Sequence, residues 1–123
     1  MKSRPIAPHL AVYRLPLLAW LSVLHRVTGV ALAGVAAGLA GWLVALALGP
    51  AWFEPAQVLL GSWFGQLGLA GSLFALSYHL CNGLRHLAWD GGYGLALKTA
   101  RLSGAAVVIA ALSLSVGVWS WLS

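Results

Sequence analysis

The sequence predicts an all-α membrane protein with three transmembrane helices, because it is strongly apolar and its few charges leave three long uncharged runs. Of the 123 residues, 61% are hydrophobic and only 7% are charged, against roughly 25% in soluble domains. A soluble fold of this size could not hide so much apolar surface, since small domains keep a large share of their surface exposed. The uncharged runs are 27–53, 55–84 and 102–123. Each exceeds the ~20 residues that an α-helix needs to cross a bilayer, so we expect one transmembrane domain over residues 1–123.

An N-terminal arm is expected over residues 1–15, before the first helix. It contains Pro5 and Pro8. Proline lacks an N–H donor and restrains the residue before it, so this arm should be irregular or lie on the membrane surface.

Glycine and proline set the ends of the expected helices. The helices are expected to cover about 16–48, 55–89 and 98–121. Gly49 and Pro50 end the first, and Asp90 with the two glycines after it ends the second. Glycines four residues apart, at 34 and 38 and at 61 and 65, are expected to be seams where helices pack closely in lipid.

The distribution of charge predicts the topology. The arm contains Lys2, Arg4 and Arg14, and the second connection is flanked by Arg85, Lys98 and Arg101, whereas the first connection contains Glu54 and no Lys or Arg. The positive-inside rule then places the N-terminus in the cytoplasm and the C-terminus in the periplasm. No signal or transit peptide is evident, so the expected location is a bacterial inner membrane. Because the net charge of +5 is explained by this asymmetry, nucleic acid is not expected as a partner.

The first helix has an unusual polar group near its start. Ser22 and Arg26 are four residues apart and share one helix face, and His25 is adjacent. Arg26 would lie roughly 15 Å into the helix, where an unpaired arginine costs at least ~2.5 kcal/mol. Snorkelling to the interface is the simpler reading, but the depth favours a polar cavity or an anionic partner.

The second helix has histidines on one stripe. His79, Gly83 and His86 follow the spacing i, i+4 and i+7. Histidine is the usual axial ligand of b-type haem, although a neutral imidazole could also simply bond a facing helix. One helix cannot supply both axial ligands, so His25 or a histidine of another chain would be the second. His86 lies about 10 Å along the axis from His79, which suits a haem edge or propionate.

Four side chains of the first two helices are expected to converge near the cytoplasmic side: His25, Arg26, Arg85 and His86. Two haem propionates would find cationic partners there. This convergence strengthens the haem interpretation.

Two long motifs resemble a known family. The motifs are Ser22-x-x-His25-Arg26-x-Thr28-Gly29 and His79-x-x-Asn82-Gly83-x-Arg85-His86-x-x-Trp89-Asp90, preceded in the arm by Arg4-Pro5, Pro8-His9 and Tyr13. In order and spacing they are similar to the cytochrome b subunit of succinate dehydrogenase (complex II). The likeness covers the arm and the first two helices, and the third helix adds only topology. Ala7 departs from the family, where many members have serine.

The resemblance implies a heterodimeric helix bundle that shares one haem b. His79 would be one axial ligand, and a histidine of a second small membrane subunit would be the other. His25 and Arg26 would approach the propionates, and His86 would lie near the haem edge. Ser22 and Arg26 would line the ubiquinone site beside the iron–sulfur subunit.

The resemblance also implies how the oxidation of succinate and the reduction of quinone are divided among the subunits. Electrons from succinate would pass through a flavoprotein subunit and an iron–sulfur subunit to the quinone in the membrane. This chain has two acidic residues in total and no dinucleotide motif, so no residue in it is expected to act on succinate. Two alternatives remain open: a fumarate reductase anchor, and a haem-free structural or transport subunit in which His79 and Arg26 pair with neighbouring helices.

Overall fold

A computed structural model describes residues 14–122, and within this range all regular structure is α-helical. The helices are α1 (Leu17–Leu48), α2 (Pro50–Gly61), α3 (Trp63–Asp90) and α4 (Leu97–Leu122). Residues 1–13 lie outside the described part of the chain, so the predicted arm over 1–15 is almost entirely untested.

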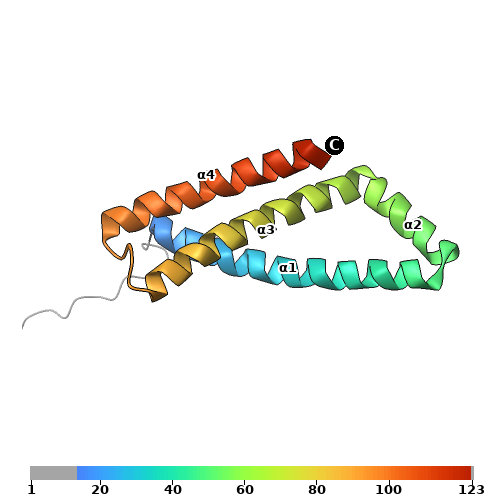
Figure 1. Cartoon of the computed structure of the whole chain (residues 1–123), viewed down its shortest axis with the longest axis horizontal. Helices are drawn as coiled ribbons and strands as arrows, with labels where there is room; N and C mark the ends of the chain where they lie inside the picture. Colours follow the sequence, from blue (N-terminus) through green and yellow to red (C-terminus); the bar gives the residue numbers. More distant parts are fainter. Residues whose placement is uncertain (1–13, 123) are drawn as a thin grey trace, which may run out of the picture.

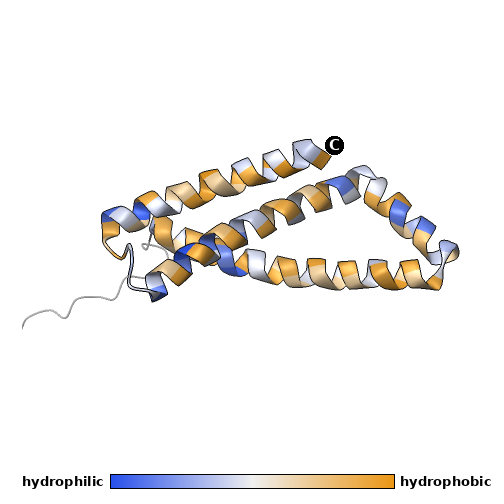
Figure 2. Cartoon of the chain, in the orientation of Figure 1, coloured by the Kyte–Doolittle hydropathy of each residue, from blue (hydrophilic) through white to orange (hydrophobic). Residues whose placement is uncertain are grey.

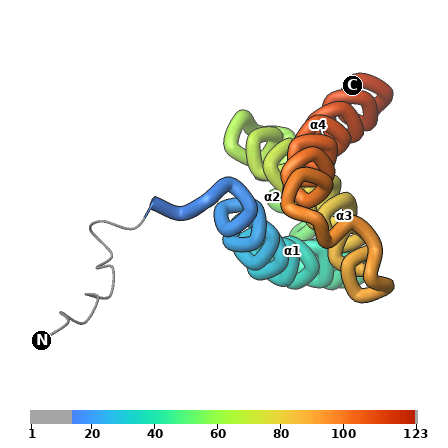
Figure 3. Tube along the Cα trace, turned by 90° about the vertical axis from the view of Figure 1, so that its left-hand side faces the viewer, coloured from blue at the N-terminus to red at the C-terminus, as the bar shows by residue number. Residues whose placement is uncertain are grey.

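Three long helices run alongside one another, and the short α2 joins α1 to α3 at one end (Figure 1). α3 packs against both α1 and α4, whereas α1 and α4 touch over a shorter length (Figure 3). The start of α1, the end of α3 and the start of α4 lie at the same end of the molecule (Figure 1). At the other end the helices diverge, and α2 bridges the gap between α1 and α3.

The small core lies where α1, α3 and α4 meet. Leu21, Tyr78, Val107 and Ala111 form its buried cluster. The Tyr78 hydroxyl is fully buried and donates to the Leu21 carbonyl oxygen at 2.8 Å, which ties α3 to α1. Most other large apolar side chains remain exposed, as expected for helices that lie in lipid.

The first helix ends just before Gly49, where the backbone has a positive φ that favours glycine. α1 begins after Pro16 and ends at Leu48, close to the expected 16–48. Gly49 has φ 99°, a left-handed conformation that residues with a Cβ rarely adopt. Pro50 then occupies the first turn of α2, where its missing N–H has no consequence.

The prediction of one continuous helix over 55–89 is wrong. The structure has two helices there, bent by 75° at Ser62. The Ser62 hydroxyl accepts a hydrogen bond from the Gly65 N–H at 3.2 Å and so caps α3. A Cβ at Gly65 would collide with the carbonyl groups of Leu59 and Leu60. Gly61 and Gly65 therefore lie on either side of a bend, rather than forming the expected packing seam.

The helix lengths fit a membrane protein. α1 and α4 are each long and apolar enough to cross a bilayer, and the bent pair α2–α3 is a third candidate span. α3 alone has 28 residues and is therefore about 42 Å long at ~1.5 Å per residue, more than the ~30 Å hydrocarbon core. The all-α membrane class is confirmed.

Candidate functional site

Three histidines meet where α1 crosses α3. His25 comes from α1, and His79 and His86 come from α3. The rings of His25 and His79 are stacked, with centroids 4.0 Å apart and planes 12° from parallel. The ring of His86 is 5.1 Å from that of His25. Figure 2 shows the most hydrophilic stretch of α1 at this crossing, between otherwise apolar helices.

The ring of His79 is held through its Nδ1 atom. This nitrogen is 3.1 Å from the carbonyl oxygen of His25 and 3.2 Å from the Thr28 hydroxyl. A carbonyl oxygen can only accept, so the proton of a neutral His79 lies on Nδ1 and Nε2 keeps its lone pair. Histidines that bind metals are commonly oriented in this way, by a backbone carbonyl on the other ring nitrogen.

Thr28 supports this arrangement from within α1. It is buried, and its hydroxyl lies 2.9 Å from the carbonyl oxygens of both Leu24 and His25. The hydroxyl thus connects the backbone of α1 to the ring of His79. Sequence reasoning gave Thr28 no role, although it lies within the first motif, because a single threonine in a helix commonly bonds its own backbone.

Two glycines let the helices approach closely enough for this contact. A Cβ placed at Gly29 would lie 3.0 Å from Cε1 of His79, which is tighter than ordinary van der Waals contact. A Cβ at Gly83 would lie 3.9 Å from Cε1 of His25. Gly29 is therefore a functional position that sequence reasoning placed in a motif but did not single out.

The geometry separates the roles of His25 and His79. Two axial imidazoles point their nitrogens at the iron from opposite faces of the porphyrin, whereas these rings lie flat against each other at 4.0 Å. His25 is thus not arranged as the trans partner of His79. Its Nδ1 atom is buried and has no hydrogen-bond partner within residues 14–122, and a buried polar atom normally has one. A free Nε2 on His79 and an unpaired nitrogen on His25 fit a haem that takes one ligand from this chain.

Ser22 and Arg26 lie one turn apart on α1, as expected. Ser22 is half-buried, whereas Arg26 is exposed. The guanidinium is therefore accessible to a group outside this chain. The structure brings the three histidines together and leaves the Arg26 side chain at the surface of α1 beside them.

Arg85 does not join the convergence of cations that the sequence predicted. Its side chain is only 7% exposed and lies against α4. Nη2 donates to the Ala100 carbonyl oxygen at 2.9 Å, and Nε donates to the Ser103 hydroxyl at 3.0 Å. Nη1 donates to Asn82 Oδ1 at 3.1 Å, and the guanidinium carbon lies 4.0 Å from the centroid of the Trp89 ring. Arg85 links α3 to α4, and each of its three nitrogens donates one hydrogen bond inside the chain.

A comparison with protein families identifies the family of this chain. A family model described as succinate dehydrogenase/fumarate reductase transmembrane subunit matches residues 1–118. The chain belongs to this family. The match extends over all four helices except the last turn of α4, and the resemblance seen in the two motifs is therefore confirmed.

Named relatives of this transmembrane subunit come from bacteria and from mitochondria. It is 45% identical over 114 residues to the succinate dehydrogenase cytochrome b556 subunit of Paracoccus denitrificans, covering 93% of this chain and 88% of the relative. It is 38% identical over 117 residues to the subunit of the same name from Rickettsia felis, covering 95% and 91%. It is also 38% identical, over an alignment of 130 residues, to the mitochondrial succinate dehydrogenase cytochrome b560 subunit of Mus musculus, covering 94% and 70%.

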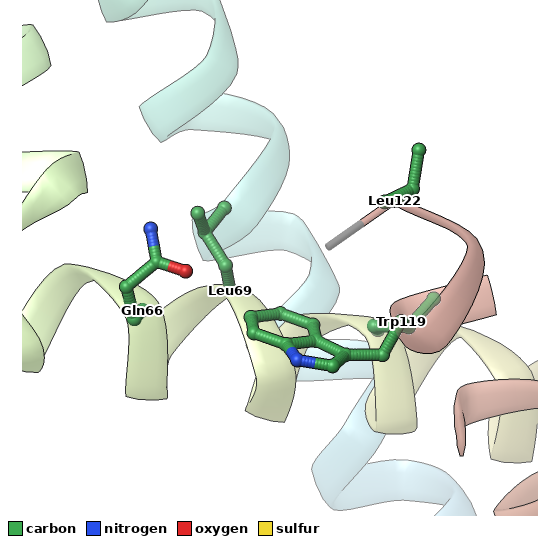
Figure 4. Close-up of a pocket in the computed structure, with 5 residues that line it drawn as sticks. Gln66, Leu69, Trp119 and Leu122 are labelled. Atoms are coloured by element: carbon green, nitrogen blue, oxygen red, sulfur yellow. The ribbon is translucent and has the colours of Figure 1, made fainter. Parts of the chain in front are cut away.

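Two apolar hollows of this transmembrane subunit lie away from the histidines. They have volumes of about 300 and 330 Å³ and lie between the start of α3 and the end of α4. Figure 4 shows one of them, with the Trp119 ring of α4 reaching toward Leu69 of α3. Their lining residues are Gln66, Leu69, Ala70, Leu73, Ser115, Val116, Trp119, Ser120 and Leu122. No titratable side chain lines either hollow, so neither resembles the predicted site.

Proposed function

We propose that this chain is the cytochrome b subunit of succinate dehydrogenase, a membrane anchor that holds one haem b and forms part of a ubiquinone-reduction site. Membership of the family and the names of the relatives support the first part. The haem assignment depends chiefly on one observation: Nδ1 of His79 is held 3.1 Å from the His25 carbonyl oxygen, which leaves Nε2 as a ligand. The relatives named above are succinate dehydrogenase subunits, so nothing here favours the fumarate reductase alternative.

His79 is the residue of this chain that would hold the haem iron. When bound, haem b would supply one-electron redox chemistry. Because His25 stacks on His79 at 4.0 Å, a histidine of a second small membrane subunit would be the other ligand. The unpaired Nδ1 of His25 and the nearby Arg26 are available for haem propionates, which need cationic or N–H partners.

The second subunit packs on α1 and completes a heterodimeric helix bundle. Gly34, Gly38 and Gly41 lie on this helix, and a Cβ at any of them would meet nothing within 4 Å in this chain. In lipid, helices associate through close contact at small residues rather than through a hydrophobic drive. The expected seam at Gly34 and Gly38 is therefore assigned to the partner.

Ser22 and Arg26 form this chain's part of the quinone site. A quinone oxygen gains negative charge as it is reduced, and a preorganised hydroxyl donor with a nearby guanidinium stabilises that charge. The two side chains share one face of α1, and Arg26 is exposed to a group from outside the chain. The flavoprotein and iron–sulfur subunits carry electrons from succinate to this site. This chain has only two acidic residues, so none of its residues is assigned to the oxidation of succinate.

Three spans, with α2–α3 as one bent crossing, give the topology. Arg14, Lys98 and Arg101 lie at the starts of α1 and α4, which share one end of the molecule (Figure 1). By the positive-inside rule this end is cytoplasmic. The N-terminus is then cytoplasmic, the C-terminus is periplasmic, and the membrane is the bacterial inner membrane.

The absorption spectrum of the purified complex tests this function. We expect a b-type haem signal in the complex with the native chain, and its loss in His79→Ala. The flavoprotein and iron–sulfur subunits should still co-purify with the variant chain, which would show that the complex assembles. A native complex without haem would support the haem-free alternative, and an unchanged spectrum in His79→Ala would exclude His79 as a ligand.

A further inference from the structure

His86 lies at the end of a chain of hydrogen bonds that begins on α4. Arg85 contacts Ala100 and Ser103 of α4 and donates through Nη1 to Asn82 Oδ1 at 3.1 Å. The Asn82 amide nitrogen in turn lies 3.3 Å from Nε2 of His86. The relay therefore connects the backbone of α4 to an imidazole beside the histidine stack.

The chemistry of the guanidinium fixes the direction of each bond in this relay. Arginine has only donors, so the Asn82 atom that faces it must be the oxygen. The amide nitrogen then faces His86, and an amide nitrogen can only donate. Nε2 of His86 must accept, so the proton of the neutral ring lies on Nδ1.

Burial keeps this direction from reversing. Asn82 is fully buried, and Arg85 is 7% exposed, so water does not compete for their hydrogen bonds. A flip of the amide would bring its N–H groups against the guanidinium and leave buried donors unpaired, which costs about 1–3 kcal/mol for each. Trp89 restrains the ring from another side, because its indole meets His86 edge to face with centroids 5.1 Å apart.

We propose that Arg85 and Asn82 are positioning residues that hold His86 in the Nδ1–H tautomer, as a hydrogen-bond donor to an oxygen of the haem. This inference rests on the proposed function for the identity of the acceptor, but the tautomer follows from the relay alone. The Nε2 lone pair of His86 is already used by Asn82, so His86 is not an iron ligand. The group that binds Nδ1–H of His86 must be a hydrogen-bond acceptor, and we assign it to a carboxylate of the haem.

The position of the His86 proton can be measured by ¹⁵N NMR of the purified complex with ring-labelled histidine. Resonances absent from a His86→Gln complex identify this residue. We expect a protonated Nδ1 and an unprotonated Nε2 in the native complex. In Asn82→Asp the carboxylate accepts from both neighbours, so the proton should move to Nε2. Gln57→Glu, the same change of amide to carboxylate in α2, should leave the His86 resonances unchanged.

Either of two results would overturn the relay: a protonated Nε2 in the native complex, or the same proton position in native and Asn82→Asp complexes. The native spectrum alone decides the first, even if the variant fails to assemble. The haem absorption of the same samples separates the two proposals. A native complex without haem refutes the proposed function, whereas a haem-containing complex with Nε2–H on His86 refutes only the relay.

Discussion

The two ends of the molecule differ in how their side chains find partners. At the histidine end, α1, α3 and α4 are joined by hydrogen bonds from Tyr78, His79 and Arg85. At the opposite end α1 diverges from α3 (Figure 1), and α3 and α4 enclose only apolar hollows (Figure 4). At the histidine end, hydrogen bonds within the chain therefore fix how the helices pack. Elsewhere the chain leaves large apolar side chains exposed, as expected of helices that lie in lipid.

This contrast predicts that changes on the Ser22–Arg26 face and at the His25–His79 contact alter chemistry, whereas changes at the far end alter only stability. The largest expected effect is on quinone reduction. Arg26→Ala should lower succinate:quinone activity by about 10²–10³-fold, the usual effect of removing one preorganised donor, while succinate-driven dye reduction persists. Ser22→Ala should cost only about 2–10-fold, the worth of one neutral hydrogen bond. Equal loss of quinone and dye activity in Arg26→Ala would instead indicate failed assembly.

A methyl group at Gly29 tests how closely the site is packed. Because a Cβ there lies 3.0 Å from Cε1 of His79, Gly29→Ala should displace the ring and lower the haem content of the complex several-fold. Gly117→Ala on α4 is the matched control, since its Cβ meets nothing within 4 Å. Haem content measured against total protein gives the comparison. Native haem content in Gly29→Ala would show that the contact is not needed.

The bend between α2 and α3 provides the corresponding test at the far end. Gly65→Ala sets a Cβ against backbone carbonyls that cannot move aside easily, so it should lower the thermal stability of the complex without changing the haem spectrum. Gly68→Ala, three residues further along and in open space, should have little effect. A changed haem spectrum in Gly65→Ala would contradict the independence of the two ends.

The smallest effect is expected for Ser103→Ala. It removes one of the bonds to Arg85 and leaves those to Asn82 and Ala100, so the loss should be about 1 kcal/mol of stability. The melting temperature of the complex should fall by a few degrees with haem content unchanged. A loss of haem would mean that the link to α4 matters more to the site than its geometry suggests.

The sequence predicted much of this arrangement because buried polar residues are rare in lipid. His25, His79 and His86 were identified from depth and spacing, and the structure gathers them at one crossing. The bend at Ser62 was missed because an uncharged apolar run gives no sign of a turn, and the cap by Ser62 is a local hydrogen bond. Arg85 was misplaced because its spacing shows the face of α3 it shares, but not that α4 folds back to accept its hydrogen bonds.

We propose that His79, and not the His25 ring stacked on it, binds the haem iron. Low-temperature EPR of the oxidised complex, with His25→Ala and His79→Ala compared side by side, tests it directly. We predict that the low-spin signal of a haem with two histidine ligands survives in His25→Ala and disappears in His79→Ala. Loss of that signal in His25→Ala with its retention in His79→Ala would contradict the account.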